Sequence, residues 1–355
     1  MPQLTAAERE ALDRAVELAQ QGPKTNPNPR VGAVLLRPDG LILAEGWHEG
    51  KGTAHAEAAA ILAAQQRDHD LRGATAVVTL EPCNHTGTTG PCAAALLQAG
   101  ITRVIYAQAD PNPPAGGGAE FLAAHGVEVV GPILHDDAAA LTYDWRRATE
   151  LGRPWVVLKT ATTADGFVAD ANGQSKWITG TPARLHAHQV RSQVPAILVG
   201  TGTALADDPS LTARGESGEL AQSQPMRVVV GKTGVPANAK LRGPGGKFQH
   251  FQTQDLNQVL TELLAQGVHS LVVEGGPTVA GWLLANDLVD ELHHYQAPVL
   301  LGIGTPMARG FQQNLAAAPR FTPLATYILG ADVFTQSYRG LSHWAPAPIL
   351  QDERQ

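Results

Sequence analysis

Four residues in the first third of the chain have the types and spacing that a catalytic zinc site needs. His55 and Glu57 stand two positions apart, and Cys83 and Cys92, the only cysteines of the sequence, follow downstream. Catalytic zinc takes three protein ligands and keeps a fourth tetrahedral position open for water. His55, Cys83 and Cys92 supply three suitable ligands. The sequence therefore predicts one Zn²⁺ held by these side chains.

Glu57 is too close to His55 in sequence to join the ligands comfortably, but it can exchange a proton with a water that zinc activates. A His-x-Glu followed by Pro-Cys and a second Cys is typical of zinc nucleobase deaminases. Here eight residues separate the cysteines, instead of the common two. The alternative is that His55 and Glu57 are ordinary helix residues and that the cysteines fill an apolar core. Both cysteines follow a proline within one short stretch, which favours the metal site.

Length and charge narrow the class of protein. The 355 residues suffice for two domains, and a net charge of −7 lacks the basic surface that nucleic-acid binding requires. No apolar stretch reaches membrane-spanning length, and the first residues open into a polar helix instead of a secretory signal. A reducing compartment also suits a zinc-thiolate site. We therefore expect a cytoplasmic enzyme without a nucleic-acid or membrane partner.

The elements around the four residues alternate between helix and strand. The sequence predicts a capped helix, a hairpin, and then helices and strands in alternation, over residues 5–22, 31–44, 55–64, 76–80, 91–100, 104–107, 120–125 and 127–130. His55 falls in the first turn of its helix, and Cys83 follows the end of a strand. Pro91 suits the first helical position, which places Cys92 near the positive end of the helix dipole. This order predicts an α/β fold whose sheet has helices on both faces.

An ordered set of motifs in this half resembles one enzyme family. The motifs are Asn28-Pro29-Arg30-Val31-Gly32, His48, His55-Ala56-Glu57, Thr79-Leu80-Glu81-Pro82-Cys83-Asn84-His85, Thr89, Pro91-Cys92 and Asp110-Pro111-Asn112-Pro113. They resemble the bifunctional riboflavin-biosynthesis enzymes, in which a pyrimidine deaminase is fused to a pyrimidine reductase. The resemblance implies a cytidine-deaminase-like three-layer α/β/α domain. It also implies zinc ligation by His55, Cys83 and Cys92, with Glu57 as the catalytic residue.

Two loops depart from that family's pattern. The family has a basic residue and two prolines before the second cysteine, where this chain has Thr88, Gly90 and Pro91. The later loop Gly116-Gly117-Gly118 lacks the lysine common there and is one residue shorter. Glycine amides can bind a phosphate through their N–H groups, although a plain turn accounts for the same residues equally well. We expect these loops to hold the substrate phosphate differently.

The second half begins where this alternation stops, near residue 148. Two apolar strands, over 196–200 and 271–274, each run into a glycine-containing turn before a helix. Such turns present backbone N–H groups to anions, although many are purely structural. They do not match the Gly-x-Gly-x-x-Gly pattern of Rossmann domains. We expect domains at 1–148 and 149–345, followed by a polar C-terminal tail at 346–355.

The family resemblance extends through this half. The motifs are Lys159-x-Ala161, Asp165-Gly166, Ser175-Lys176-Trp177-Ile178, Arg191, Val199-Gly200-x-x-Thr203, Asp207-Asp208-Pro209-x-Leu211-x-x-Arg214 and Glu274-Gly275-Gly276. They are similar to the reductase half of the same enzymes, whose α/β fold resembles dihydrofolate reductase. The resemblance implies that NADPH contacts Ala161, Trp177, Thr203, Asp207, Gly276, Pro277, Thr278, Val279, Ala280, Gly281 and Trp282. It implies that the substrate contacts Ser175, Arg191, Leu211, Arg214 and Glu274.

Arg191 and Arg214 are physically suited to hold a ribose phosphate. A guanidinium is planar, always charged and able to donate hydrogen bonds in pairs. The alternative is that both form surface salt bridges, which contribute little. Phe167 departs from the family, which has a basic residue after Asp-Gly. The preference for NADPH over NADH rests on the resemblance alone.

The resemblance implies a bifunctional enzyme of riboflavin biosynthesis that acts on a small phosphoribosyl pyrimidine, and we expect it to form a homo-oligomer. With Zn²⁺ it would deaminate 2,5-diamino-6-(5-phosphoribosylamino)pyrimidin-4-one. With NADPH it would then reduce the ribosyl chain to give 5-amino-6-(5-phosphoribitylamino)uracil. One alternative is a single-activity nucleoside or tRNA deaminase with a non-catalytic second domain, and another is a binding protein with a silenced zinc site. The acidic charge argues against tRNA, and the intact zinc residues argue against silencing.

Overall fold

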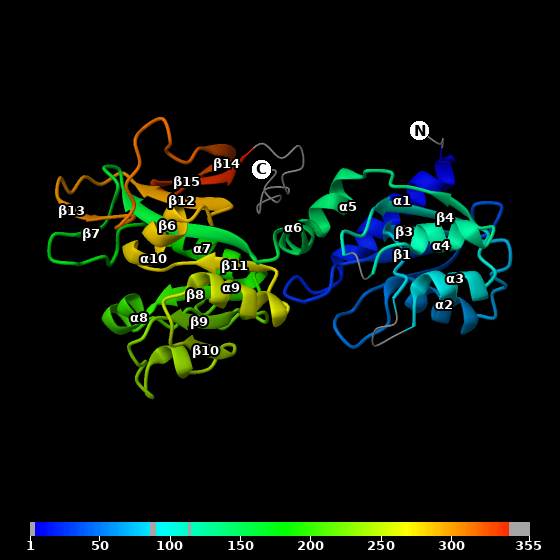
Figure 1. Cartoon of the computed structure of the whole chain (residues 1–355), viewed down its shortest axis with the longest axis horizontal. Helices are drawn as coiled ribbons and strands as arrows, with labels where there is room; N and C mark the ends of the chain where they lie inside the picture. The colour runs from blue at the N-terminus through cyan, green and yellow to red at the C-terminus, as the bar shows by residue number, and fades with distance from the viewer. Residues whose placement is uncertain (1–3, 86–89, 113–114, 341–355) are drawn as a thin grey trace. The chain divides into compact units, whose positions relative to one another are not determined.

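The computed structural model describes residues 4–85, 90–112 and 115–340. The chain divides into two compact units, Met1–Leu151 and Gly152–Gln355, which we call the first and second units (Figure 1). The boundary expected near residue 148 lies inside a helix, Tyr143–Leu151, and the division follows the last residue of that helix. The tail expected at 346–355 lies outside the described residues.

The first unit is built on a five-stranded sheet of order β2-β1-β3-β4-β5. Strand β1 pairs antiparallel with β2 and β3, whereas β3, β4 and β5 are parallel. The elements are α1 Ala6–Gln20, β1 Gly32–Leu36, β2 Ile42–Trp47, α2 Ala56–Gln65, β3 Thr75–Leu80, α3 Cys92–Gln98, β4 Arg103–Gln108, α4 Gly118–Ala124, β5 Glu128–Val130, α5 Asp136–Leu141 and α6 Tyr143–Leu151.

Helices cover both faces of this sheet. Residues of α1 and α5 pack with Val34, Val77 and Ile105 on one face. Residues of α2, α3 and α4 pack with Leu35 and Val78 on the other face. Because both faces are covered, β1 is buried along its whole length, as the unbroken apolar run in the sequence indicates. The predicted three-layer α/β/α arrangement is confirmed.

The second unit contains an eight-stranded sheet of order β10-β9-β8-β11-β6-β12-β15-β14 and a two-stranded sheet of β13 and β7. The strands from β10 to β12 in that order are parallel, and β15 and β14 complete the sheet antiparallel. The elements are β6 Trp155–Thr163, β7 Phe167–Asp170, α7 Thr181–Gln193, β8 Ala196–Gly200, α8 Thr201–Asp207, β9 Met226–Val230, the 3₁₀ helix η1 Lys240–Arg242, β10 Phe248–Phe251, α9 Leu256–Ala265, β11 Ser270–Val273, α10 Pro277–Ala285, β12 Glu291–Ala297, β13 Gly304–Pro306, β14 Phe321–Leu329 and β15 Asp332–Arg339.

The parallel strands bring two predicted turns together. Strand β11 pairs with β8 and β6, so the carboxyl ends of all three strands lie at one edge of the sheet. Gly200 ends β8 there, and Glu274 follows the last residue of β11. Open α/β sheets bind ligands outside the carboxyl ends of their strands. Over the described residues, no helix is both long enough and apolar enough to cross a membrane.

Candidate active sites

Three elements of the first unit deliver the predicted zinc ligands to one place. Cys83 follows β3, Cys92 is the first residue of α3, and His55 precedes α2. The expected helix starts are wrong by one residue. His55 is the extended N-cap of α2 instead of a first-turn residue, and Pro91 is the N-cap of α3 instead of its first helical residue. The N-cap position leaves the His55 ring outside the helix and free to face the cysteines.

The geometry of these side chains fits a tetrahedral zinc ion. His55 Nδ1 lies 3.6 Å from Cys83 Sγ and 3.3 Å from Cys92 Sγ, and one ligand atom of each residue lies within 4.8 Å of the others. Ligand atoms bonded to one zinc at about 2.0–2.3 Å are separated by roughly 3.5 Å. The three side chains are therefore spaced as one metal ion requires.

The pKa shifts of the two thiols also indicate a metal site. Hydrogen bonding to the Cys92 thiol lowers the pKa of Cys83, and the backbone N–H of Cys92 also donates to Cys83 Sγ at 3.5 Å. Hydrogen bonding to Cys83 together with burial raises the pKa of Cys92, because two adjacent anions in a buried site repel each other. A bound cation would let both thiols ionise together. The donor set thus fits a dithiolate metal site.

Glu57 lies in the first turn of α2 and is only 4% exposed. Burial and the adjacent negative charge of Cys83 raise the pKa of this carboxyl to about 7. A carboxyl that titrates near neutrality can both accept and donate a proton under working conditions. Glu57 therefore has the environment of a general acid–base residue.

A second histidine supports the ring of His55. His48 packs edge-on against His55 with ring centroids 5.4 Å apart. Its Nδ1 lies 3.0 Å from the Ala54 carbonyl oxygen, and its Nε2 lies 3.0 Å from the Asn28 side-chain nitrogen. An amide nitrogen only donates, so His48 accepts from Asn28 and donates to Ala54. The sequence analysis included Asn28 and His48 only as parts of family motifs and assigned them no role.

The glycine loop of the first unit is fixed to the strand that leads to Cys83. The Glu81 carboxylate accepts hydrogen bonds from the backbone N–H groups of Asp110 (3.3 Å) and Ala119 (3.1 Å). A Cβ at Gly118 would lie 1.8 Å from the Pro82 carbonyl oxygen, so packing alone requires glycine there. Thr88, Thr89 and Pro113 lie outside the described residues.

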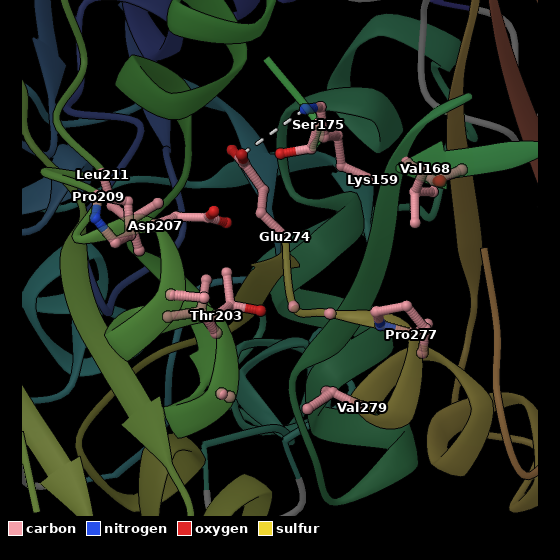
Figure 2. Close-up of a pocket in the computed structure, with 18 of the residues that line it drawn as sticks. Lys159, Val168, Ser175, Thr203, Asp207, Pro209, Leu211, Glu274, Pro277 and Val279 are labelled. Carbon is pink, nitrogen blue, oxygen red and sulfur yellow. Dashed lines mark ion pairs between the residues drawn. The ribbon is translucent and has the colours of Figure 1, made fainter. Parts of the chain in front are cut away.

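The second unit has a cavity of about 1210 Å³ at the carboxyl ends of its parallel strands. Figure 2 shows Glu274 near the centre, with Lys159 and Ser175 on one side of it and Asp207, Leu211 and Thr203 on the other. The lining contains almost every residue expected to bind cofactor or substrate, namely Ala161, Ser175, Trp177, Arg191, Thr203, Asp207, Leu211, Arg214, Glu274, Gly276, Pro277, Thr278, Val279, Ala280 and Trp282.

Gly281 is the exception, because it is not among the cavity's lining residues. It is a buried residue of α10, and a Cβ there would lie 1.8 Å from the Arg309 carbonyl oxygen. The helix needs glycine at this position so that the backbone of Arg309 can pack against it. Gly281 therefore has a packing role, and its expected cofactor contact stays a prediction.

Glu274 is held by two cations at the wall of the cavity. Both Arg191 side-chain donors, Nε and Nη2, lie 2.7 Å from its carboxylate oxygens, and Lys159 Nζ lies 3.7 Å away. Burial by itself would raise the pKa of Glu274, but Arg191 and Lys159 outweigh it and hold the pKa at about 2. Arg191 also donates to the Thr212 carbonyl. It forms a buried bidentate pair, so it is not a surface salt bridge, and its expected contact with the substrate stays a prediction.

Arg214 makes fewer hydrogen bonds within the protein than Arg191 does. Its Nε donates to Thr212 Oγ1 at 3.1 Å and its Nη1 to the Gly218 carbonyl at 2.7 Å. These bonds fix the side chain at the cavity, while the structure records no bond from its Nη2. Arg214 thus keeps a donor available for a ligand.

Some residues at this cavity were not predicted. The lining also includes Lys159, Thr201, Gly231, Lys240 and Thr253. A signal existed for Lys159, because it is the one charged residue of the mostly buried strand β6, Trp155–Thr163. Lys240 and Thr253 carry no such signal, since only the sheet order brings their loops to the cavity.

A zinc pocket in one unit and a large cavity at the strand ends of another define a two-activity chain, a zinc-dependent deaminase joined to a reductase. Two family matches agree with this division. Residues 5–108 match the cytidine and deoxycytidylate deaminase zinc-binding region, and residues 154–335 match the RibD C-terminal domain. The chain belongs to the riboflavin biosynthesis protein RibD family, whose members are bifunctional deaminases and reductases.

Relatives from several bacteria span most of the chain. The riboflavin biosynthesis protein RibD of Corynebacterium ammoniagenes is 42% identical over 85% of this chain and 89% of its own length. The Escherichia coli RibD is 37% identical over 91% of this chain and 96% of its own. Zinc and NADPH are the cofactors that these two domains imply.

Solved structures agree over nearly the whole chain. A deaminase/reductase crystal structure from Thermotoga maritima has a TM-score of 0.81 and 32% identity, and covers 94% of this chain and 99% of that chain. Acinetobacter baumannii RibD has a TM-score of 0.81 and 34% identity with the same coverage. The predicted fold, a cytidine-deaminase-like domain followed by a dihydrofolate-reductase-like domain, is confirmed.

Proposed function

We propose that the first unit deaminates 2,5-diamino-6-(5-phosphoribosylamino)pyrimidin-4-one. The observation that carries this proposal is the convergence of His55, Cys83 and Cys92 on one point beside the buried carboxyl of Glu57. The Thermotoga maritima enzyme is named a diaminohydroxyphosphoribosylaminopyrimidine deaminase, which supports the choice of substrate. Net hydrolysis exchanges the ring amino group for an oxygen from water and releases ammonia.

The residues of the first unit divide this chemistry between them. His55, Cys83 and Cys92 would hold the zinc, which when bound lowers the pKa of a water molecule. Glu57 takes a proton from the attacking water and delivers a proton to the departing amino group. Hydrogen bonds to Asn28 and the Ala54 carbonyl fix the His48 ring, which packs edge-on against His55 and supports it. Glu57 is thus the catalytic residue of this unit.

The second unit reduces the ribosyl chain of the deaminated product. When bound, NADPH would supply the hydride, and the cavity residues would align it with the sugar carbon. We assign cofactor contacts to Ala161, Trp177, Thr203, Asp207 and residues 276–282, and substrate contacts to Ser175, Arg191, Leu211, Arg214 and Glu274. Arg191 also pairs with Glu274, and Lys159 adds a cation at the same wall. Asp207 lies across the cavity from Glu274, where it would assist at the reacting sugar (Figure 2).

Three further properties belong to this proposal. The enzyme acts in the cytoplasm, forms a homo-oligomer and has no nucleic-acid partner. The net charge of −7 supports the last point, because a nucleic-acid surface needs a basic patch. The thiolate ligands support a reducing compartment.

An assay of the purified chain tests both activities. We expect ammonia release from the diaminopyrimidine substrate, and NADPH oxidation once the deaminated product is present. A chain that releases ammonia but never oxidises NADPH would be a single-activity deaminase. The same assay with NADH checks cofactor choice, and equal kcat/KM with both cofactors would contradict the preference for NADPH.

A further inference from the structure

The side chain of Trp177 is unusual in the cavity of the second unit. It lines the cavity, yet 71% of its surface is exposed. It lies in the stretch between β7 and α7, outside any helix or strand. An indole that is left mostly in water gains little from burial, so the surrounding apolar core does not fix its orientation. Another contact must do so if the ring is to serve as a wall of the cavity.

Arg184 provides that contact. The central carbon of its guanidinium lies 4.6 Å from the Trp177 ring centroid, which is the geometry of a cation–π stack. Two hydrogen bonds fix the guanidinium itself, one from Nη1 to the Thr179 carbonyl at 2.7 Å and one from Nη2 to Thr181 Oγ1 at 2.9 Å. Arg184 is therefore a rigid support fastened to the start of α7, and the indole lies against it.

The indole keeps a surface available for a ligand. Among the residues that the structure describes, no aromatic ring contacts Trp177, and Arg184 is the one cation over it. Aromatic side chains bind flat rings by offset stacking. We propose that Arg184 is a positioning residue for the reductase reaction, which holds Trp177 as a flat platform against which a planar ring of the nicotinamide cofactor stacks. This inference rests on the proposed binding of NADPH in the cavity.

The chain contains a matched control. Arg242 lies over the Phe248 ring at 4.5 Å, and it too donates to two backbone acceptors, the carbonyls of Pro236 and Val235. Arg242 and Phe248 are not among the residues that line the cavity. Arg242→Ala thus removes an equivalent stack from the same unit without touching the proposed platform.

The test measures NADPH dissociation constants by titration calorimetry for the full-length chain and its variants. We expect Arg184→Ala to raise the Kd about fivefold, the scale of an exposed cation–π contact plus the loss of fixed orientation. At saturating NADPH, kcat should stay within about twofold, because Arg184 acts on binding. Arg184→Lys keeps the charge but not the planar stack, and should restore only part of the affinity. Arg242→Ala should leave the Kd unchanged.

A double-mutant cycle separates positioning from direct contact. If Arg184 acts through the indole, Arg184→Ala should add almost nothing to the Kd of Trp177→Ala. An equal effect of Arg184→Ala with and without the indole would overturn the inference in favour of a direct cofactor contact. An unchanged Kd for Arg184→Ala in a chain whose wild type binds NADPH would overturn it as well. Absence of NADPH binding by the wild type would instead contradict the proposed function. If Arg184→Ala does not fold, Arg184→Lys carries the same cycle.

Discussion

The two sites differ in how far along the chain their residues are drawn from. The zinc pocket takes all its ligands from between His55 and Cys92, and its ligand atoms lie within 4.8 Å of one another. The reductase cavity is lined by residues from Leu158 to Met307 and encloses about 1210 Å³. A metal site needs a few atoms at fixed distances, whereas a cofactor and substrate need a long surface. A compact site can therefore be read from local spacing, and an extended one depends on the order of strands in the sheet.

The two sites also balance their charges differently. In the first unit, two thiols and Glu57 converge, and each ionised group opposes the ionisation of the next. In the second unit, Glu274 already has Arg191 and Lys159 as protein partners. The zinc pocket thus requires an external cation to be fully ionised, while the cavity wall is compensated by the chain itself. A substitution in the first unit should therefore affect deamination alone, and one in the second unit should affect reduction alone.

The largest expected effect comes from removing both thiols. Cys83→Ser with Cys92→Ser leaves one histidine and no thiolate, so the chain should lose its one zinc and all measurable deamination. NADPH oxidation with the deaminated intermediate should stay within about twofold, because the cavity draws on no residue of the first unit. Elemental analysis and the two activity assays check this. Full metal retention by the double variant would show that the zinc ligands lie elsewhere.

Glu57→Gln should have the next largest effect. The amide cannot transfer the proton, so deamination should fall at least ~100-fold, the scale of general acid–base catalysis. Zinc content and NADPH oxidation should be preserved, since the ligands and the second unit are unchanged. Loss of both reactions in a folded, zinc-loaded variant would mean that the two activities share one site or are strongly coupled.

The sequence predicted the compact site more completely than the extended one. The types and spacing of His55, Cys83 and Cys92 were enough, because strand ends and helix starts are locally encoded. The helix starts were misplaced by one residue, since His55 and Pro91 are the N-caps of their helices and not helical residues. The layered α/β fold also followed from the alternation of helix and strand.

The residues that line the cavity were predicted from family motifs more than from local sequence patterns. The bidentate pair of Arg191 with Glu274 could not be predicted, because their separation along the chain is 83 residues. Gly281 shows a related limit. Its packing role could not be predicted, because the backbone of Arg309, which packs against it, is remote in sequence. Contacts between residues so far apart along the chain cannot be predicted from the spacing of motifs in the sequence.

A buried histidine should make the second unit sensitive to acid. His186 is fully buried and its Nδ1 lies 2.8 Å from the Tyr295 hydroxyl. Burial, and then the charge of His293, lowers its pKa to about 4. The unfolded chain takes up this proton near pH 6.5, so stability is complete above that pH and declines as pH falls toward 4. At pH 4.5 the loss from this residue should be roughly 2 kcal/mol.

His186→Gln should remove that part of the pH dependence, because glutamine does not titrate. Denaturant unfolding of the second unit at pH 7.5 and pH 4.5 measures the difference, with wild type and variant compared at each pH. The gap between the two pH values should shrink by roughly 2 kcal/mol in the variant. An unchanged gap would show that other groups account for the acid sensitivity.

The smallest expected effect is that of replacing Arg214, which differs from Arg191 in its hydrogen bonds at the cavity. Among the described residues, none accepts a hydrogen bond from Nη2 of Arg214, whereas Nε, Nη1 and Nη2 of Arg191 each bond to Glu274 or Thr212. Arg214→Ala should therefore lower kcat/KM for reduction about tenfold, the value of one charge-assisted hydrogen bond to phosphate, mostly through KM for the deaminated intermediate. Ammonia release should stay nearly intact. Arg320→Ala, an exposed arginine whose recorded bond is to the Leu315 carbonyl, is the control. If KM for the intermediate did not change in Arg214→Ala, the substrate phosphate would have to be bound by another group, and the role inferred for Arg214 would be wrong.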